Sequence, residues 1–349
     1  MNSVTDAAIA ALGEGQGADW RLQPETHAHL LGPAAGPLER ILLQPSLGAI
    51  MASFNAADAK ASAAQSHYKR LAKTSAVASF LAVVIASALL LPRATVVPPV
   101  SLTLATFVQF ALLAVSFMCS LWTGFARPFE TWMRQRAQAE TKRIELFDTV
   151  LAASEMAQPG ELPLLPLQLE YVRRFQLDVQ RAYYKRRGRQ HLWVARRGVV
   201  LRALALLIIA IAVIPVLANL RGSGWIPQSL APVFNRLPEP AELAQRVFLS
   251  LGLIGGALQG LLAAYALLGQ DERNAARYAD TSQNLEALAH GPLSEARAAA
   301  AAGTRGPVLT FVALLHQQIS SEHREWVALR TIAPDLSLDR LKAMSLPRL

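Results

Sequence analysis

The sequence predicts an all-α integral membrane protein with two transmembrane helical hairpins and long cytoplasmic helices. Four hydrophobic stretches without a charged residue occupy positions 74–91, 100–125, 203–220 and 247–268. A helix of about 20 mostly apolar residues crosses the bilayer core, and each stretch is close to that length. Hydrophobic residues make up 52% of the chain and charged residues 17%, so the composition is too apolar for a typical soluble enzyme.

The basic residues outside these stretches predict the orientation in the membrane. Lys69, Arg70 and Lys73 precede the first stretch, and a dense basic segment between 181 and 197 precedes the third. The loop between the first two stretches has Arg93 as its one cation. Because Lys and Arg mark the cytoplasmic flanks of spanning helices, we expect a multi-pass protein with both termini in the cytoplasm. We attribute the net charge of +9 to electrostatic attraction to the membrane surface, and we expect no nucleic-acid partner.

The same basic flanks predict contacts with lipid. Clusters of Lys and Arg next to a span attract anionic lipid head groups. We expect Arg196, Arg197 and Arg202 to anchor the third stretch in this way. Trp225 follows that stretch and is suited to the aromatic belt at a membrane surface.

The order of segments predicts three regions and an internal duplication. Residues 1–50 contain many Gly and Pro residues and are expected to form a flexible cytoplasmic leader. A first hairpin unit then covers 51–160 and a second covers 161–349. Both units follow the order of basic helix, two spans, polar helix, Pro–Gly break and amphipathic helix, which favours a duplication. Any four-span protein with alternating loop lengths would look similar, so this alternative stays open.

Two expectations concern the helices outside the membrane. The second span is expected to run straight on into a polar helix over 129–157. After Pro166, Leu167, Tyr171, Phe175 and Val179 recur every four residues. This spacing predicts an amphipathic helix whose opposite, polar face carries Arg173, Arg174, Gln176 and Gln180.

Small residues form a stripe in the fourth span. Its members, spaced by three, one and four residues, are Gly252, Gly255, Gly256 and Gly260. Such residues let helix backbones approach closely in lipid. The stripe predicts packing against another helix, in the same chain or in another subunit, and Gly256 and Gly260 are expected to be its centre. A hinge or a permissive pore wall is the alternative.

Polar residues inside the spans are few. Gln109 in the second span and Gln259 in the fourth could bond each other or line a narrow pore in an oligomer, because polar groups in hydrocarbon need partners or water. No Asp, Glu or Lys lies within a span, which argues against an ion-coupled transporter.

No motif in the sequence predicts catalysis. Phosphate-binding loops, His-Glu-x-x-His zinc motifs and paired cysteines are missing from the sequence, and Cys119 is the one cysteine. We therefore expect no enzyme activity, no catalytic residue, no metal ligand and no cofactor.

A short motif after the first hairpin resembles a known family. Its residues are Trp132, Arg134, Arg136, Glu140, Lys142 and Arg143, and a second acidic motif later contains Glu322 and Trp326. This pattern resembles the SLATT family, two-transmembrane effectors associated with SMODS nucleotidyltransferases and SLOG sensor domains. The resemblance covers about 55–157 and, more loosely, 165–330. The chain departs from the family pattern in two ways. It has four predicted spans where the family usually has two, and we expect no attached sensor domain.

The resemblance implies a function at the bacterial inner membrane. It implies an effector or channel-like protein that forms a homo-oligomer and perturbs membrane permeability when a cytoplasmic sensor or nucleotide-signalling partner acts. A non-conducting membrane scaffold that recruits a cytoplasmic partner is an alternative of nearly equal weight. A small transporter is a weaker alternative, because the spans offer few polar residues for a path.

Overall fold

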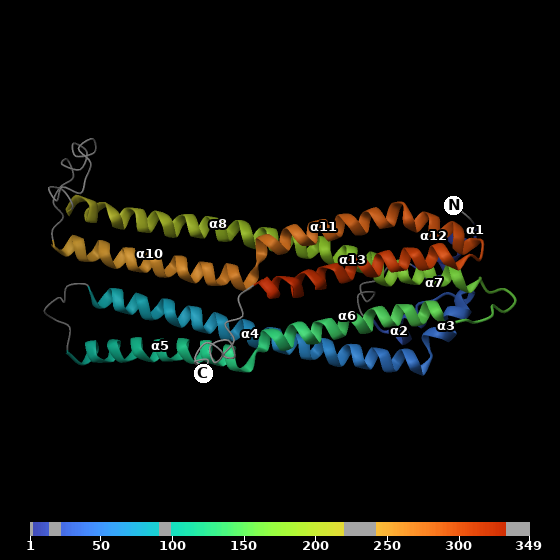
Figure 1. Ribbon diagram of the computed structural model, residues 1–349, viewed down its shortest axis with the longest axis horizontal. Coiled ribbons are helices and arrows are strands. Elements are labelled where there is room, and N and C mark those ends of the chain that lie inside the picture. Colours follow the sequence, from blue (N-terminus) through green and yellow to red (C-terminus); the bar gives the residue numbers. More distant parts are fainter. Residues whose placement is uncertain (1–2, 14–21, 91–98, 220–241, 333–349) are drawn as a thin grey trace, which may run out of the picture. The chain divides into compact units, whose positions relative to one another are not determined.

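The protein is helical throughout the residues that its computed structural model describes, which are 3–13, 22–90, 99–219 and 242–332 (Figure 1). No strand occurs in these ranges. The helices are α1 (Ser3–Ala11), α2 (Pro24–Ala28), a 3₁₀ turn (Pro33–Ala35), α3 (Gly36–Leu42), α4 (Pro45–Leu89), α5 (Pro99–Ala126), α6 (Pro128–Ala152), α7 (Leu164–Val172), a π-helical turn (Arg173–Asp178), α8 (Val179–Asn219), α10 (Glu242–Gly269), α11 (Asp271–His290), α12 (Pro292–Ala301) and α13 (Arg305–Ile332).

The chain forms two compact units, and each unit combines segments that are distant in sequence. Unit 1 contains residues 1–62, 131–189 and 275–349, and unit 2 contains 63–130 and 190–274. Helices α4 and α8 contribute to both units. This division differs from the consecutive units expected over 51–160 and 161–349, because these two long helices lead the chain from unit 1 into unit 2 and it later returns.

Unit 1 has an apolar core that includes the amino-terminal helices. The completely buried side chains of Leu12, Leu38 and Ile41 belong to the same core cluster as Phe147 and Phe311. The described part of residues 1–50 is therefore packed into unit 1, which differs from the flexible leader expected from its Gly and Pro residues. Several of these prolines stand at the first turn of a short helix, where the missing N–H costs nothing.

Unit 2 is a row of four long helices in the order α8, α10, α4 and α5 (Figure 1). Ser79 of α4 contacts Ser116 of α5, and Ser250 of α10 contacts the Ser87 carbonyl of α4. Side chains of α8 lie against glycines of α10. In each pair, contacts that come later on one helix come earlier on the other, so neighbouring helices are antiparallel.

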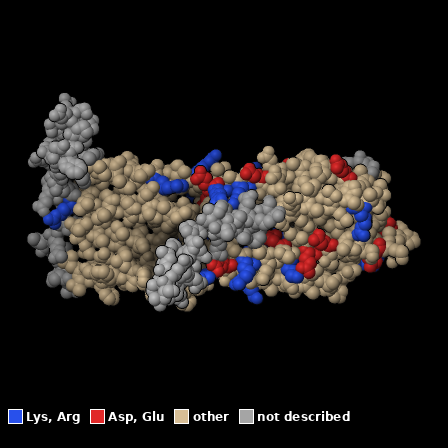
Figure 2. Space-filling model, in the orientation of Figure 1, with Lys and Arg blue, Asp and Glu red and all other residues tan. Residues whose placement is uncertain are grey.

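The two units distribute apolar side chains in opposite ways. All members of the large buried cluster belong to unit 1. Among the described residues, all the exposed large hydrophobic side chains belong to unit 2 except Leu43, Met156, Leu309 and Leu314. Figure 2 shows the corresponding surface, with wide uncharged areas over the helices of unit 2. Such a surface is suited to lipid and not to water.

Three helices are long and apolar enough to cross a membrane. They lie in α4, in the part Leu102–Ala126 of α5, and in the segment that starts at Arg246 in α10. These helices contain the second and fourth predicted spans and the first up to Leu89, while residue 91 lies outside the described residues; they are consistent with a membrane protein. The third predicted span, 203–220, lies in α8 up to Asn219, and its last residue lies outside the described residues.

Both apolar helices that lead toward a polar helix end at an abrupt break. Arg127 separates α5 from α6 and Gln270 separates α10 from α11, and both residues have positive φ values of 43° and 45°. The expectation that the second span runs straight on into the polar helix is therefore wrong. The left-handed conformation of one residue is costly for non-glycine residues, and it redirects the chain at this point.

The packing of α3 can be tested with two adjacent leucines. Leu42 is 1% exposed and Leu43 is 48% exposed. We expect Leu42→Ala to lower the free energy of unfolding by about 2–5 kcal/mol, because truncation of a buried leucine leaves a cavity. Leu43→Ala should change it by less than about 0.5 kcal/mol. Urea unfolding of the purified full-length protein in detergent measures both, and equal small effects would indicate a loose leader.

Candidate functional site

The helix at the centre of unit 1 is buried over most of its surface. This central helix comprises α7, the π-helical turn and the first residues of α8, together 164–180. The apolar face expected from the sequence is buried except for Val179, which is partly buried. Arg174, Gln176 and Gln180 on the expected polar face are buried too. Buried polar groups are costly unless they form hydrogen bonds, so their partners explain the arrangement.

Two polar side chains of the central helix, Gln168 and Arg174, bind the carboxyl ends of neighbouring helices. Gln168 donates through Nε2 to the carbonyl oxygens of Val150 and Ala153 at the end of α6, at 2.6 and 3.0 Å. Arg174 donates to the carbonyl oxygens of Leu12 and Gly13 just after α1. The last carbonyls of a helix lack partners within the helix, so the central helix supplies donors that α1 and α6 need.

A buried carboxylate joins the central helix to α12. Glu170 is 1% exposed and accepts hydrogen bonds from Arg297 Nε at 2.6 Å and from Arg297 Nη2 at 3.0 Å. Arg173 also binds Glu170, and its other end binds Asp178. The hydrogen bond to Glu170 raises the pKa of Arg297, whereas burial raises the pKa of Asp178. This ion-pair network explains how a carboxylate is accommodated inside unit 1.

An aromatic group fixes α2 on the same helix. The Tyr171 hydroxyl lies 2.8 Å from His27 Nδ1, and the His27 ring stacks on Phe175 with ring centroids 3.9 Å apart. Burial raises the pKa of Tyr171, so the phenol stays protonated and can donate to the imidazole. His27 is itself 1% exposed, and its contact draws the amino-terminal segment into the core.

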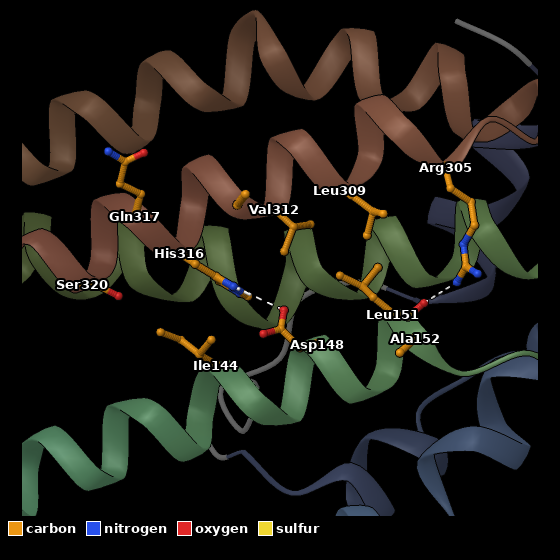
Figure 3. A pocket seen from close by; sticks show the side chains of 11 residues that line it. Ile144, Asp148, Leu151, Ala152, Arg305, Leu309, Val312, His316, Gln317 and Ser320 are labelled. Atoms are coloured by element: carbon orange, nitrogen blue, oxygen red, sulfur yellow. Dashed lines mark hydrogen bonds and ion pairs between the residues drawn. The ribbon is translucent and has the colours of Figure 1, made fainter.

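A groove with a volume of about 1000 Å³ lies between α6 and α13 and is the main candidate binding site of the described residues (Figure 3). Its floor is apolar, with Ile144, Leu151, Leu309 and Val312 among its lining residues. Asp148 and His316 face each other across the groove, and Arg305 lies beyond Leu309. Arg305 donates to the Leu151 carbonyl at 2.5 Å, so it also caps the end of α6. The groove therefore offers apolar surface with a few oriented polar groups, as ligand sites do.

His316 connects the groove with the central helix. Its Nε2 lies 3.2 Å from Gln176 Oε1, and its Nδ1 lies 3.4 Å from Asp148 Oδ1. A neutral imidazole has one N–H, whereas both neighbouring atoms, Gln176 Oε1 and Asp148 Oδ1, are acceptors. Gln176 Nε2 is buried without a hydrogen-bond partner. With the Gln176 amide turned over, its NH₂ donates to Nε2 and His316 donates from Nδ1 to Asp148, so both contacts are satisfied.

The residues of the family-like motif lie in unit 1 and hold α4 against α6. Arg136 binds Asp58 of α4 at 3.0 Å and Glu140 of its own helix at 2.7 Å. These carboxylates outweigh burial and raise the pKa of Arg136. Trp132 is partly buried on α6. The side chains of Glu322 and Trp326 lie outside the described residues, so this second motif is not placed.

Serine hydroxyls connect α4 and α5 in unit 2. Ser75 Oγ lies 3.0 Å from Ser116 Oγ and 2.9 Å from Ser120 Oγ, and Ser79 Oγ lies 2.6 Å from Ser116 Oγ. Ser250 donates to the Ser87 carbonyl at 2.8 Å and so connects α10 with α4. Hydrogen bonds of this kind hold helices together where lipid provides no hydrophobic drive.

Gln109 and Gln259 lie at different depths of unit 2. Gln259 precedes Tyr265 by six residues, so the antiparallel contact of Tyr265 with Lys73 places it level with Ser79. Gln109 precedes Ser116 by seven residues, and the Ser116 contact with Ser79 places it level with Ala86. The two levels are about 10 Å apart along the helices, so a direct bond between the amides does not form. Gln259 Oε1 is buried without a partner among the described residues.

The glycine stripe faces two directions. A Cβ on Gly255 would lie 2.8 Å from Ile209 Cγ1, and one on Gly252 would lie 3.3 Å from Ala212 Cβ, so these two glycines pack on α8. Gly256 and Gly260 have no atom within 4 Å of such a Cβ. Close packing within the chain therefore uses Gly252 and Gly255, and not the Gly256–Gly260 pair expected to be its centre.

The predicted lipid-anchoring residues lie at the start of the apolar part of α8. Arg196 and Arg197 are exposed, and Arg197 Cζ lies 3.5 Å from the ring centroid of Trp193. Arg202 is partly buried and donates to the Gly198 carbonyl one turn earlier. Trp225 lies outside the described residues.

Sequence reasoning missed the groove, Asp58, the Glu170–Arg297 pair and the serine contacts. The serines carried a usable signal, because Ser75 and Ser79 on one span and Ser116 and Ser120 on the next are each four residues apart. That spacing places both members of a pair on one helix face. His316 and Glu170 carried no local signal, since their partners are distant in sequence.

The helix contact at Gly255 predicts opposite effects for two adjacent substitutions. We expect Gly255→Ala to destabilise the protein by about 1–3 kcal/mol, because the methyl group would overpack against Ile209. Gly256→Ala should stabilise it by about 0.5–1 kcal/mol, since glycine is unfavourable within a helix. Thermal unfolding of both variants in detergent, compared with the wild-type protein, measures the difference. A similar shift for both would contradict the packing of Gly255 on α8.

The burial of His316 predicts a pH dependence of stability. Burial lowers the pKa of His316 below its ordinary value of 6.5, although Asp148 opposes this effect. The unfolded chain then binds a proton more readily than the folded chain, so stability is retained above pH 6.5 and is lost as pH falls through 6.5 toward the folded-state pKa. Between about pH 7.5 and pH 5.5 we expect the wild-type free energy of unfolding to fall more than that of His316→Gln. Parallel curves from urea unfolding would show that His316 is not the group responsible.

Comparison with known proteins gives one family match. Residues 52–148 match the model of a family described as "Protein of unknown function (DUF4231)". The match begins in α4, includes α5 and ends within α6, so it contains Asp58, Arg136 and Glu140. No curated protein and no solved structure matches the chain.

Proposed function

We propose that the chain is a bacterial inner-membrane effector with four spans, which assembles with copies of itself and changes membrane permeability when unit 1 binds a cytoplasmic partner or nucleotide signal. One observation carries this proposal, namely the opposite placement of apolar side chains in the two units. Unit 1 is built for water, whereas unit 2 exposes apolar surface that requires lipid. The resemblance of the motif around Trp132 and Arg136 to the SLATT family supports the effector role.

Helix α8 is the proposed additional span. Leu204, Leu206 and Leu207 are exposed on it as the side chains of a lipid-facing helix would be. Its contacts with Gly252 and Gly255 give it the same antiparallel relation to α10 that α4 has to α5. The breaks at Arg127 and Gln270 each end the second apolar helix of a hairpin. This repeated feature supports a duplication of the hairpin.

The groove between α6 and α13 is the proposed receiving site. A partner that binds there contacts His316 and Asp148, and His316 bonds Gln176 of the π-helical turn. The central helix continues without interruption into α8. Binding energy at the groove can therefore act on the helix that becomes the third span, provided that the partner binds two arrangements of this helix with different affinity.

The free face of α10 is the proposed contact between copies. Leu249, Leu253, Gly256, Gly260 and Leu267 are exposed and follow one another at intervals of three, four or seven residues. This spacing places them on one side of the helix. Small residues in the middle of such a face allow two spanning helices to approach closely.

A non-conducting scaffold is the second candidate, and the serine contacts favour it. The hydroxyls of Ser75, Ser79 and Ser116 bond one another between α4 and α5. They are consequently satisfied without water and do not outline a polar path. In this case the apolar row anchors unit 1 at the membrane, and the groove recruits a partner without any conductance.

Membrane potential and growth after induced expression in bacteria test the effector proposal. We expect the wild-type protein to depolarise the membrane, and Gly256→Leu/Gly260→Leu to abolish this effect because bulky side chains block the contact between copies. Gly124→Leu is the matched control, because Gly124 also lies in an apolar helix with no atom within 4 Å of its Cβ position.

All three proteins must be inserted to equal levels, as shown by retention in membranes after alkaline extraction. An inserted wild-type protein without any effect, with or without co-expressed sensor genes from the same genomic neighbourhood, would contradict the effector proposal. The scaffold would then be favoured. Equal loss of activity in Gly124→Leu would contradict the assembly through α10.

A further inference from the structure

Aromatic rings of unit 2 lie beside a cation or a histidine. Lys73 Nζ of α4 lies 5.7 Å from the ring centroid of Tyr265 of α10. Arg197 Cζ lies 3.5 Å from the ring centroid of Trp193 on α8. On α5, the Trp122 indole donates to His67 Nε2 of α4 at 3.3 Å. Each of the four long helices of unit 2 contributes to at least one of these pairs, and α4 contributes to two.

The pairs lie at one level of the helix row. The contact of Lys73 with Tyr265 connects α4 to α10, and the antiparallel contact of Ser75 with Ser120 places Trp122 of α5 level with Lys73. Gly255 of α10 lies beside Ile209 of α8. Because the two helices are antiparallel, Tyr265, ten residues after Gly255, is level with Val199, ten residues before Ile209 and close to Arg197. The pairs therefore form a girdle across all four helices.

The girdle marks one boundary of an apolar slab. From Trp122 to Leu102 α5 extends about 30 Å, from Tyr265 to Val247 α10 extends about 27 Å, and from Lys73 to Leu89 α4 extends about 24 Å. These lengths approach the thickness of a bilayer core, which is about 30 Å. Trp and Tyr are enriched where a spanning helix leaves the hydrocarbon, so the girdle lies at the level of the lipid head groups.

The two cations of the girdle are not neutralised by acidic side chains. Lys73 and Arg197 are exposed, and neither forms an ion pair within 4.0 Å among the described residues. Two acids near this level have other partners, since Asp271 binds His191 at 2.6 Å and Glu130 lies 3.8 Å from Arg127. A cation over an aromatic ring keeps its charge and its N–H donors.

We propose that this girdle binds the head-group phosphates of anionic phospholipids, with Lys73 and Arg197 as the phosphate ligands and Trp193 and Tyr265 as the rings that hold them in place. A phosphate accepts charge-assisted hydrogen bonds from both kinds of cation. The site rests on the proposed four-span arrangement of unit 2, and it names the membrane component that this arrangement recognises.

The test compares lipid-induced stabilisation of the full-length protein in a neutral detergent. Phosphatidylglycerol should raise the thermal midpoint of the wild-type protein more than phosphatidylcholine does. In Lys73→Gln/Arg197→Gln we expect the phosphatidylglycerol concentration for half of this shift to rise at least tenfold, because each such cation strengthens binding roughly fivefold. Trp193→Leu, which retains both charges, should lose part of the same preference.

Arg186→Gln/Arg189→Gln is the matched control, because it removes two exposed positive charges of the same helix before the girdle. An equal loss in this control would overturn the proposal in favour of unspecific attraction by net charge. An equal shift with inorganic phosphate would also overturn it, because the site would then bind soluble anions. The proposal would also be overturned if the wild-type protein showed no preference for phosphatidylglycerol over phosphatidylcholine.

Alkaline extraction of membranes separates this result from the proposed function. A protein that is retained in the membrane but has no preference for phosphatidylglycerol contradicts the girdle alone. A protein that is released contradicts the four-span arrangement itself. A preference for phosphatidylglycerol in a protein without any effect on membrane potential supports lipid binding by the girdle and favours the scaffold function over the effector function.

Discussion

Unit 1 depends on the hydrogen bonds of one buried polar helix. Gln168, Glu170, Tyr171, Arg174 and Gln176 of the central helix bind groups at the ends of α6 and α1 or side chains of α12, α2 and α13. A buried polar group that loses its partner costs about 1–3 kcal/mol. Each neighbouring helix therefore has one favourable position against the central helix. This constraint selects a unique arrangement, whereas an apolar helix of the same length would tolerate sliding.

Unit 2 differs from unit 1 because its apolar side chains lie on the outer surface. Its outer surface is apolar, so burial of hydrocarbon does not distinguish contact with lipid from contact with another helix. The specific contacts are consequently small and polar, namely the serines between α4 and α5 and the close approach of Gly252 and Gly255 to α8. Polar atoms stabilise both units, but in unit 1 they orient a hydrophobic core and in unit 2 they replace one.

The parts of the fold that local sequence determines were predicted, and the parts that depend on distant partners were not. Long apolar runs predicted the helices of unit 2, because the length and polarity of a span are local properties. The burial of Arg174 could not be predicted, since its acceptors at Leu12 and Gly13 are far away in the sequence. Likewise, nothing in the sequence distinguishes Gly255, which packs on Ile209, from Gly256, which does not. For the candidate site the sequence indicated Arg136 and Glu140 but not the groove, which forms only when α13 returns to α6.

The polar atoms of unit 2 limit how a permeability change could arise. Ser75, Ser79 and Ser116 satisfy one another, and Ala78 and Ala82 of the same helix are buried. In the described part of unit 2 the helices lie in a row (Figure 1), so we place a water-filled path between copies and not within one. A water-filled path then has to form between the surfaces of several copies. The exposed residues of α10 either line this path or form the contact between copies. The effector proposal and the assembly of copies consequently stand or fall together, whereas the scaffold needs neither.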